Sequence, residues 1–445
     1  MSSSNFETRK QMIITVKNLG VIKKAEFDTS KKLTVFCGPN STGKTYIAYI
    51  IYAIYRNKNI FKLKSFSEAK DAFDKHIKIK IKKEYIDELL SKIADYCKKS
   101  IGEIFGISEE NENKFFKQFV VNISISNEEY QNIIEKEYYV NWNGESLTLK
   151  YNNIDYLNPL NNKIDIQEEL LWCLMLKSLI FQDTYMFPVE RNSIYTFKTE
   201  LSLSRNQLLD TILDKKANIS KITDLLGQRS RRYPLAIKDN LYIANDLENV
   251  QKYKSQLYTF TNELEDELLQ GKIVINQNGE VEYKTRNGIS LPIGISSSIV
   301  KTLSSLIVAL KYQVNYGDLL IIDEPEMNLH PDNQVILAKV LAKISNNVRM
   351  IVSTHSDYII RELNNLIVAK SLETRGNRMH EQFYDKESLL DYNNVQVLYF
   401  DHGNDEQVSV KSLDVDKYGF AVDSMDETIN KQNERMQILF GQMDD

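Results

Sequence analysis

The chain has 445 residues, 42% of them hydrophobic, and a formal net charge of −5, which is typical of a globular protein with two or three domain-sized units. The acidic balance excludes a general electrostatic attraction to nucleic acid, and only a local basic patch would provide one. No segment approaches the roughly 18 apolar residues of a membrane span, and the N-terminus has no apolar signal core. Three cysteines without metal-binding spacing suit a reducing compartment, so we expect a cytoplasmic protein.

Strands and helices alternate in the first part of the chain. Apolar segments at 12–16, 22–27 and 33–37 predict strands, and the third runs into a glycine-rich loop. Apolar residues at helical spacing predict one helix after Lys44 and an amphipathic helix over 84–104. Further along we expect strands at 115–126, 137–149 (with a hairpin turn at Asn143-Gly144) and 184–189, and a helix at 165–181.

Residues 200–270 are polar and helical in pattern. Apolar side chains step by three or four positions from Leu247 to Leu268, so we expect one long helix that packs on a neighbour. Asn278-Gly279 predicts a hairpin turn immediately after this segment. The remaining pattern predicts a helix at 299–312, a strand at 318–323, a helix at 331–344 and a strand at 349–353. This alternation indicates a parallel sheet.

The glycine-rich loop after the third strand is a complete phosphate-loop pattern. Its glycines let successive backbone N–H groups face phosphate, and the helix that follows points its positive end at the same place. Lys44 is expected to reach the β- and γ-phosphate oxygens of ATP, and the Thr45 hydroxyl is expected to bind Mg²⁺. The loop residues are Gly38, Pro39, Asn40, Ser41, Thr42, Gly43, Lys44 and Thr45.

Two acidic residues stand at the end of the strand expected at 318–323: Asp323 is its last residue, and Glu324 follows. Asp323 closes a run of apolar residues, where a carboxylate needs a partner such as a metal ion. Glu324 is then placed to orient or deprotonate water. His355 follows the next strand, where its imidazole can contact the γ-phosphate or the attacking water. An acidic turn and a structural histidine are the plainer interpretations of these positions.

The segments Asp-Glu-Pro-Glu-Met-Asn-Leu-His-Pro at 323–331 and Ser-Thr-His-Ser at 353–356 resemble the ABC-type ATPase heads of the SMC, RecF and OLD group. They differ from hexameric AAA+ motors. The resemblance extends to the ATPases of the Septu and PARIS systems of bacterial antiphage defence. It implies an α/β fold, an ABC-type P-loop NTPase head with a mixed sheet and a helical insertion. It also implies that Asp323 binds Mg²⁺, Glu324 is the catalytic base, His355 is the switch histidine and 328–332 is a dimer-contacting loop.

Two further positions follow from the resemblance. Ser297 lies where these heads carry their signature loop, and it is expected to contact the ATP that a second subunit holds. The usual glycines are missing there, and a plain helix N-cap is the alternative. Arg191, in a Pro-x-x-Arg segment, is expected either to approach phosphate or the Mg²⁺ shell, or to form a structural salt bridge.

These features divide the chain into an ATPase head over 1–199 and 271–400, a helical insertion over 200–270 and a C-terminal tail over 401–445. The tail is expected to contain a helix that docks a partner. The expected function is that of an ATP-hydrolysing subunit of an antiphage defence complex, bound to itself in an ATP-sandwiched dimer or larger homo-oligomer and to a separately encoded nuclease effector, with nucleic acid as a further possible ligand.

Two alternatives remain open. A RecF-like repair clamp would use ATP to close on DNA, and the basic runs at 75–83 and 229–232 would then meet phosphate rather than solvent. A fused anticodon nuclease would have its active site within 360–445. The candidate residues for that site are Arg375, Arg378, His380 and Glu381.

Overall fold

The computed structural model describes residues 12–56, 76–79, 81–135, 138–142, 146–151, 154–159, 183–195, 233–402 and 407–441. The helix expected at 165–181 and the arginine cluster at 229–232 lie outside these residues. In the basic run at 75–83, side chains are described only for 81–83. No helix within the described ranges is long and apolar enough to span a membrane.

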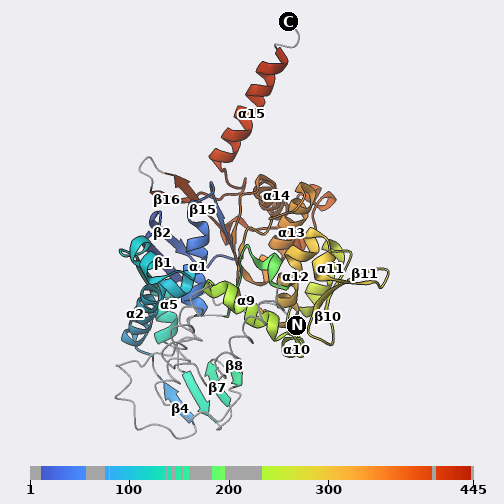
Figure 1. Cartoon of the computed structure of the whole chain (residues 1–445). Coiled ribbons are helices and arrows are strands. Elements are labelled where there is room, and N and C mark those ends of the chain that lie inside the picture. The colour runs from blue at the N-terminus through green and yellow to red at the C-terminus, as the bar shows by residue number, and fades with distance from the viewer. Residues whose placement is uncertain are drawn as a thin grey trace, which may run out of the picture.

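A mixed sheet of nine strands forms the body of the protein (Figure 1), with the spatial order β5-β1-β2-β16-β15-β3-β14-β13-β9. The five strands from β15 to β9 are parallel to one another, whereas β15 pairs antiparallel with β16, and β1, β2 and β5 form an antiparallel group. The α/β class with a mixed sheet is therefore confirmed. The strands are β1 Met12–Leu19, β2 Ile22–Asp28, β3 Leu33–Cys37, β5 Val120–Ile125, β9 Thr184–Phe187, β13 Leu319–Asp323, β14 Arg349–Ser353, β15 Val395–His402 and β16 Val408–Leu413.

Helices cover the two faces of the parallel strands and enclose two hydrophobic cores. Alternate residues of β13 point to opposite faces: Leu319 and Ile321 pack in the core beneath α1, and Leu320 and Ile322 pack in the core beneath α12 and α13. Every residue of β3 and β13 is buried, as expected for strands covered on both sides. The first core is covered by α1 Lys44–Arg56, α2 Lys83–Lys99, α3 Ile101–Phe105 and α9 Leu235–Asn245, and the second by α11 Tyr258–Leu268, α12 Ser298–Tyr312, α13 Pro331–Asn347 and α14 Asp357–Thr374.

Two small antiparallel sheets accompany the main one. The hairpin expected around Asn278-Gly279 is confirmed by β10 Gly271–Ile275 and β11 Val281–Thr285, to which β12 Ser290–Pro292 adds a third strand. Gly279 takes a φ of 69° in the turn, a conformation that favours glycine. The second sheet has the order β4-β6-β7-β8, with β4 His76–Ile79, β6 Tyr138–Trp142, β7 Ser146–Tyr151 and β8 Ile154–Pro159. Its β6–β7 pair confirms the second expected hairpin.

Some expected elements are wrong in extent. The single helix over 247–268 is instead α10 Leu247–Val250 and α11, because the intervening chain bonds to α12: the Ser255 N–H donates to the Lys311 carbonyl at 2.8 Å. The helix expected over 84–104 divides at Ser100 into α2 and α3. The strand expected over 115–126 is shorter, because α4 Glu109–Phe115 precedes β5 and its N-terminus is capped by the Ser108 side chain.

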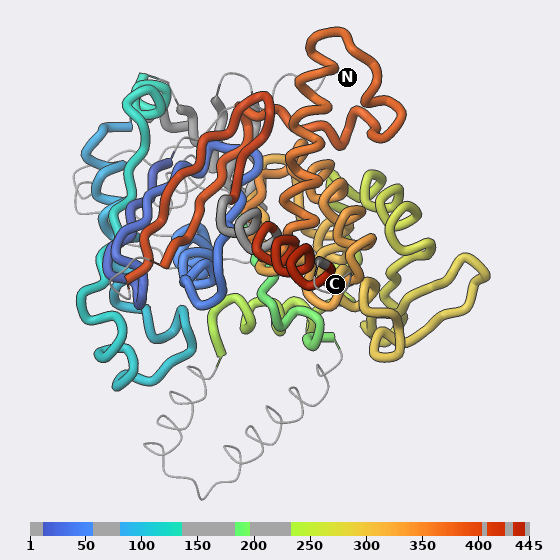
Figure 2. The backbone as a smooth tube through the Cα atoms, turned by 90° about the horizontal axis from the view of Figure 1, so that it is seen from above, coloured from blue at the N-terminus to red at the C-terminus, as the bar shows by residue number. Residues whose placement is uncertain are grey.

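The last part of the chain belongs partly to the sheet. β15 and β16 lie between β3 and β2, so the position at 400 where we expected the head to end falls inside β15. Figure 2 shows the two strands, in red, beside the blue N-terminal strands. The expected tail helix is present as α15 Asp423–Gly441, which projects from the body in Figure 1.

Gly38, the first residue after β3, generates a prediction about packing. It has a φ of 132°, and a Cβ at this position would lie well inside van der Waals contact with the Phe400 carbonyl oxygen of β15. Gly38→Ala should therefore lower the thermal unfolding midpoint, with a loss of about 1–3 kcal/mol from overpacking alone. Gly317→Ala is the matched control, because Gly317 also has a positive φ but has nothing within 4 Å of such a Cβ. Equal losses in the two variants would show that the close approach of β15 does not restrict position 38.

Candidate functional site

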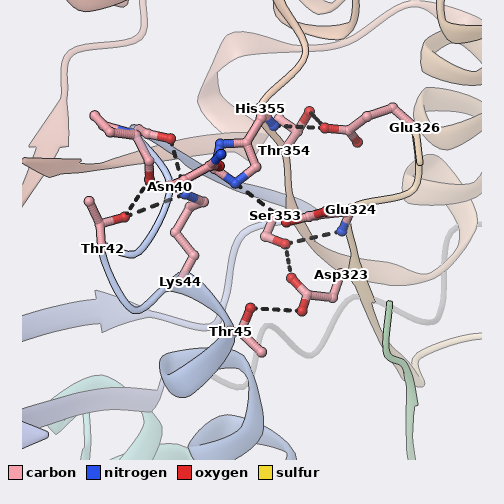
Figure 3. Close-up of polar contacts among 12 residues, drawn as sticks. Asn40, Thr42, Lys44, Thr45, Asp323, Glu324, Glu326, Ser353, Thr354 and His355 are labelled. Atoms are coloured by element: carbon pink, nitrogen blue, oxygen red, sulfur yellow. Dashed lines mark hydrogen bonds and ion pairs between the residues drawn. The ribbon is translucent and has the colours of Figure 1, made fainter. Parts of the chain in front are cut away.

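The carboxyl ends of the five parallel strands meet at one edge of the sheet, where ligands bind in open α/β folds. The phosphate loop follows β3, Asp323 ends β13 and Ser353 ends β14. The loop after β9 carries Arg191, and β15 ends at His402. The strand order therefore brings together residues that are hundreds of positions apart in sequence (Figure 3).

The phosphate loop curls around its own lysine. Lys44 is 5% exposed, and its Nζ donates to the carbonyl oxygens of Gly38 at 3.0 Å and Pro39 at 2.7 Å. Burial lowers the pKa of Lys44 to about 8, while the carboxylates of Glu324 and Asp323 act in the opposite direction. The φ values of Ser41 and Gly43, 63° and 86°, produce the tight turn that precedes α1. The loop backbone and the Lys44 ammonium group therefore lie together at the N-terminus of α1, as phosphate binding requires.

Thr45 and Asp323 form the contact that joins the two halves of the site. The Thr45 hydroxyl donates to Asp323 Oδ2 at 2.8 Å across 278 positions of sequence. The Ser353 hydroxyl donates to the other oxygen, Oδ1. Asp323 is 1% exposed, so its carboxylate is held on both oxygens in a buried place. A hydroxyl and a carboxylate oxygen at hydrogen-bond distance are hard ligands of the kind that Mg²⁺ prefers, and they fit the implied cation.

Glu324 and His355 face each other beside this contact. His355 Nε2 lies 3.4 Å from Glu324 Oε1. Burial lowers the pKa of His355 to about 4, with the nearby Lys44 charge acting in the same direction, so the imidazole is neutral near pH 7. Burial, followed by the charges of Asp323 and Glu326, raises the pKa of Glu324. Glu324 also has a φ of 45°, which is uncommon for a residue with a side chain.

Arg191 holds the turn that carries these carboxylates. It is 2% exposed, and its guanidinium donates to the carbonyl oxygens of Asp323 at 2.6 Å and Glu324 at 2.7 Å. A third bond reaches the Pro188 carbonyl at 3.1 Å. The interpretations from sequence were an approach to phosphate or the Mg²⁺ shell, or a structural salt bridge, whereas the contacts that the structure shows are to backbone carbonyls.

Sequence reasoning missed two side chains of the site. One is Ser353, which binds Asp323 and also accepts from the Glu324 N–H at 3.2 Å. The other is Glu326, whose Oε1 accepts from the Thr354 hydroxyl and from the His355 N–H, both at 2.7 Å. Both residues stand inside the segments that carried the resemblance, at 323–331 and 353–356. Their polar character next to buried strands was the available signal.

Ser297 and Asn40, two further expected residues, differ in their contacts. Ser297 is exposed at the N-cap of α12, and among the described residues no hydrogen bond joins it to Thr45, Asp323 or His355. Its side chain makes no capping bond to α12 either, so the N-cap alternative lacks its usual contact. Asn40 contributes its carbonyl, which lies 3.1 Å from His402 Nε2.

The residues considered for a nuclease site differ in burial and in their contacts. His380 is buried, with Nδ1 3.0 Å from the Asn377 carbonyl, whereas the Arg378 side chain is 84% exposed. Arg378 and Glu381 are separated by 3.9 Å on the surface. Arg375 ends α14 as its C-cap.

Comparisons with known proteins concern the family of the chain and its similarity to a curated relative. A family model described as an AAA ATPase domain matches residues 12–360, which include the phosphate loop, Asp323, Glu324 and His355. A curated relative, the "Retron Vc95 probable ATPase" of Vibrio cholerae serotype O1 biovar El Tor, is 24% identical over 192 residues. The match covers 40% of this chain and 36% of the relative, so the chain spans about a third of that protein's length.

Among solved structures, SMC head domains are similar to this chain. A head bound to the C-terminal winged-helix domain of ScpA has a TM-score of 0.37 and 14% identity, covering 92% of this chain and 98% of that one. A head with an extended coiled coil, bound to the C-terminal domain of ScpA and derived from Pyrococcus furiosus, has a TM-score of 0.38 and 14% identity, covering 96% and 99%.

Proposed function

Since this chain belongs to the AAA ATPase domain family and is an ATP hydrolase, we propose roles for the residues gathered at the sheet edge. Lys44 and the backbone of 38–45 bind the ATP phosphates, and Thr45 and Asp323 hold Mg²⁺, which offsets phosphate charge when bound. Glu324 accepts a proton from the attacking water, and the neutral His355 beside it orients that water. The observation that carries these roles is the Thr45–Asp323 contact of 2.8 Å, which places a hydroxyl and a carboxylate at the end of the phosphate loop.

Glu324→Gln tests the proposed base. The variant should bind ATP as the native chain does but hydrolyse it at least about 100-fold more slowly, since general-base catalysis contributes factors of that order. Isothermal calorimetry and phosphate release measure the two quantities separately. Lys44→Ala is the control, because it should lose binding itself. Near-native turnover in Glu324→Gln would assign the base to another residue.

We further propose that the head completes its site by pairing with a second copy. The exposed Ser297, whose hydroxyl makes no capping bond, supports this proposal, as does its place at the start of the 15-residue helix α12. In the pair, the N-terminus of α12 and the Ser297 hydroxyl of one head would meet the γ-phosphate that the other head holds. The loop at 328–332, where Asn328 and His330 are exposed, would lie in the same interface.

Mixing two inactive variants tests this arrangement directly. Ser297→Arg blocks the contact between Ser297 of one head and the γ-phosphate in the other, and Lys44→Ala blocks nucleotide binding. Each variant alone should therefore be inactive. A mixed pair contains one complete site, formed by the phosphate loop of the first and Ser297 of the second, and should recover a substantial fraction of native turnover. The control mixture of Ser297→Arg with the Ser297→Arg/Lys44→Ala double variant should stay inactive. Full activity of Ser297→Arg alone, or no recovery in the mixture, would contradict a shared site.

For the biological role we propose an antiphage defence complex in which this ATPase controls a separate nuclease effector. The similarity to a retron ATPase over 192 residues supports this role. The described C-terminal helix α15 supports a docked partner, since residues 430–440 are all exposed and include Met436, Leu439 and Phe440.

A phage challenge tests the defence role. Cells that express the chain together with its neighbouring gene should survive infection at least about tenfold better than cells with an empty vector. Lys44→Ala should remove the protection without lowering protein abundance. Equal survival of native and Lys44→Ala cells, across a panel of phages, would exclude an ATP-dependent defence function for this pair.

A further inference from the structure

Glu326 joins the turn after β13 to the end of β14. Its Oε1 accepts two hydrogen bonds at 2.7 Å, one from the Thr354 hydroxyl and one from the His355 backbone N–H (Figure 3). The other oxygen, Oε2, is buried and has no hydrogen-bond partner among the described residues. Burying a carboxylate here costs desolvation free energy, which the two hydrogen bonds to Oε1 offset in part.

The two bonds fix the backbone of His355. The Thr354 N–H still pairs with the Phe36 carbonyl at 2.9 Å, so the sheet pattern continues up to that residue. The next N–H, that of His355, turns away from the sheet to Glu326. The orientation of this peptide determines the direction in which the His355 side chain leaves the backbone. With this orientation, His355 Nε2 lies 3.4 Å from Glu324 Oε1.

The contacts continue beyond His355 to the start of α13. Thr354 Oγ1 accepts from the Ser356 N–H at 3.0 Å, and the Ser356 hydroxyl donates to Gln334 Oε1 at 2.5 Å. Gln334 Nε2 in turn donates to the Leu329 carbonyl at 2.8 Å. A continuous series of polar contacts therefore links the His355 backbone with the loop at 328–332.

We propose that Glu326 is a positioning residue for ATP hydrolysis, which holds His355 against Glu324 and joins this geometry to the loop at 328–332. The inference rests on the proposed role of His355. Glu326 makes no hydrogen bond or ion pair with the phosphate loop in the described contacts, and its charge is the weakest of those that raise the pKa of Lys44. Its removal should therefore affect the chemical step more than nucleotide binding. Displacing a catalytic group by about 1 Å is enough to slow a reaction by about 100-fold.

A double-mutant cycle separates this role from a purely structural one. Glu326→Ala should lower kcat by about 10–100-fold while the KM for ATP changes by less than about threefold. Glu326→Gln, whose amide oxygen can accept the same two bonds, should retain turnover within about threefold of the native enzyme. In the His355→Ala background, Glu326→Ala should slow hydrolysis no further, because the residue it positions is already gone.

The outcomes are distinguishable. Additive losses in the cycle would overturn the proposal, as would a raised KM with unchanged kcat. If His355→Ala hydrolysed ATP at the native rate, the proposed function of His355 would fail first. Should Glu326→Ala not fold, Thr354→Val removes one of the two bonds to Glu326, together with the acceptor of the Ser356 N–H, at nearly constant volume. It should show a smaller kcat loss with the same dependence on His355, and independence from His355 would again overturn the proposal.

Discussion

The hydrogen bond between Thr45 and Asp323 depends on the order of three parallel strands. β14 lies between β3 and β13, so Thr45 and Asp323 approach each other across its end, and Ser353 of β14 binds the same carboxylate. A single exchange in strand order would separate these groups by the width of a strand, about 4.7–4.9 Å. The sheet therefore acts as the scaffold that sets distances at the site, and the long segments between the motifs are free to carry other structure.

Three charged groups are buried within this small region, and each depends on the others. Lys44, Arg191 and Asp323 are 5%, 2% and 1% exposed. Burial lowers the pKa of Arg191 to about 10, and the carboxylates of Asp323, Glu326 and Glu324 act against that shift. Removing one member of such a group leaves its partners buried without compensation, which typically costs several kcal/mol. These three charged groups also lie where the phosphates of a nucleotide and a cation would bind. The contacts that stabilise the fold in this region are therefore the same contacts that form the site.

Much of the fold and the centre of the site could be predicted from sequence, because both depend on local patterns. The phosphate loop, Asp323 and His355 each follow an apolar strand, and their convergence follows from parallel pairing. Contacts between residues that are distant in the sequence could not be predicted in the same way. Nothing local to Ser255 indicates that it bonds to the end of α12, so the helix over 247–268 was expected to be continuous. In the sequence, Glu326 is one more acidic residue in a turn, and only the structure shows that its side chain accepts a hydrogen bond from the His355 N–H.

The phosphate loop has a direct neighbour in β15, whose Phe400 carbonyl excludes any side chain at Gly38 and whose His402 contacts the Asn40 carbonyl. β15 pairs with β16, and the chain reaches the projecting helix α15 shortly afterwards. The backbone that curls around Lys44 and the projecting helix α15 are therefore linked through two paired strands and the segment 414–422.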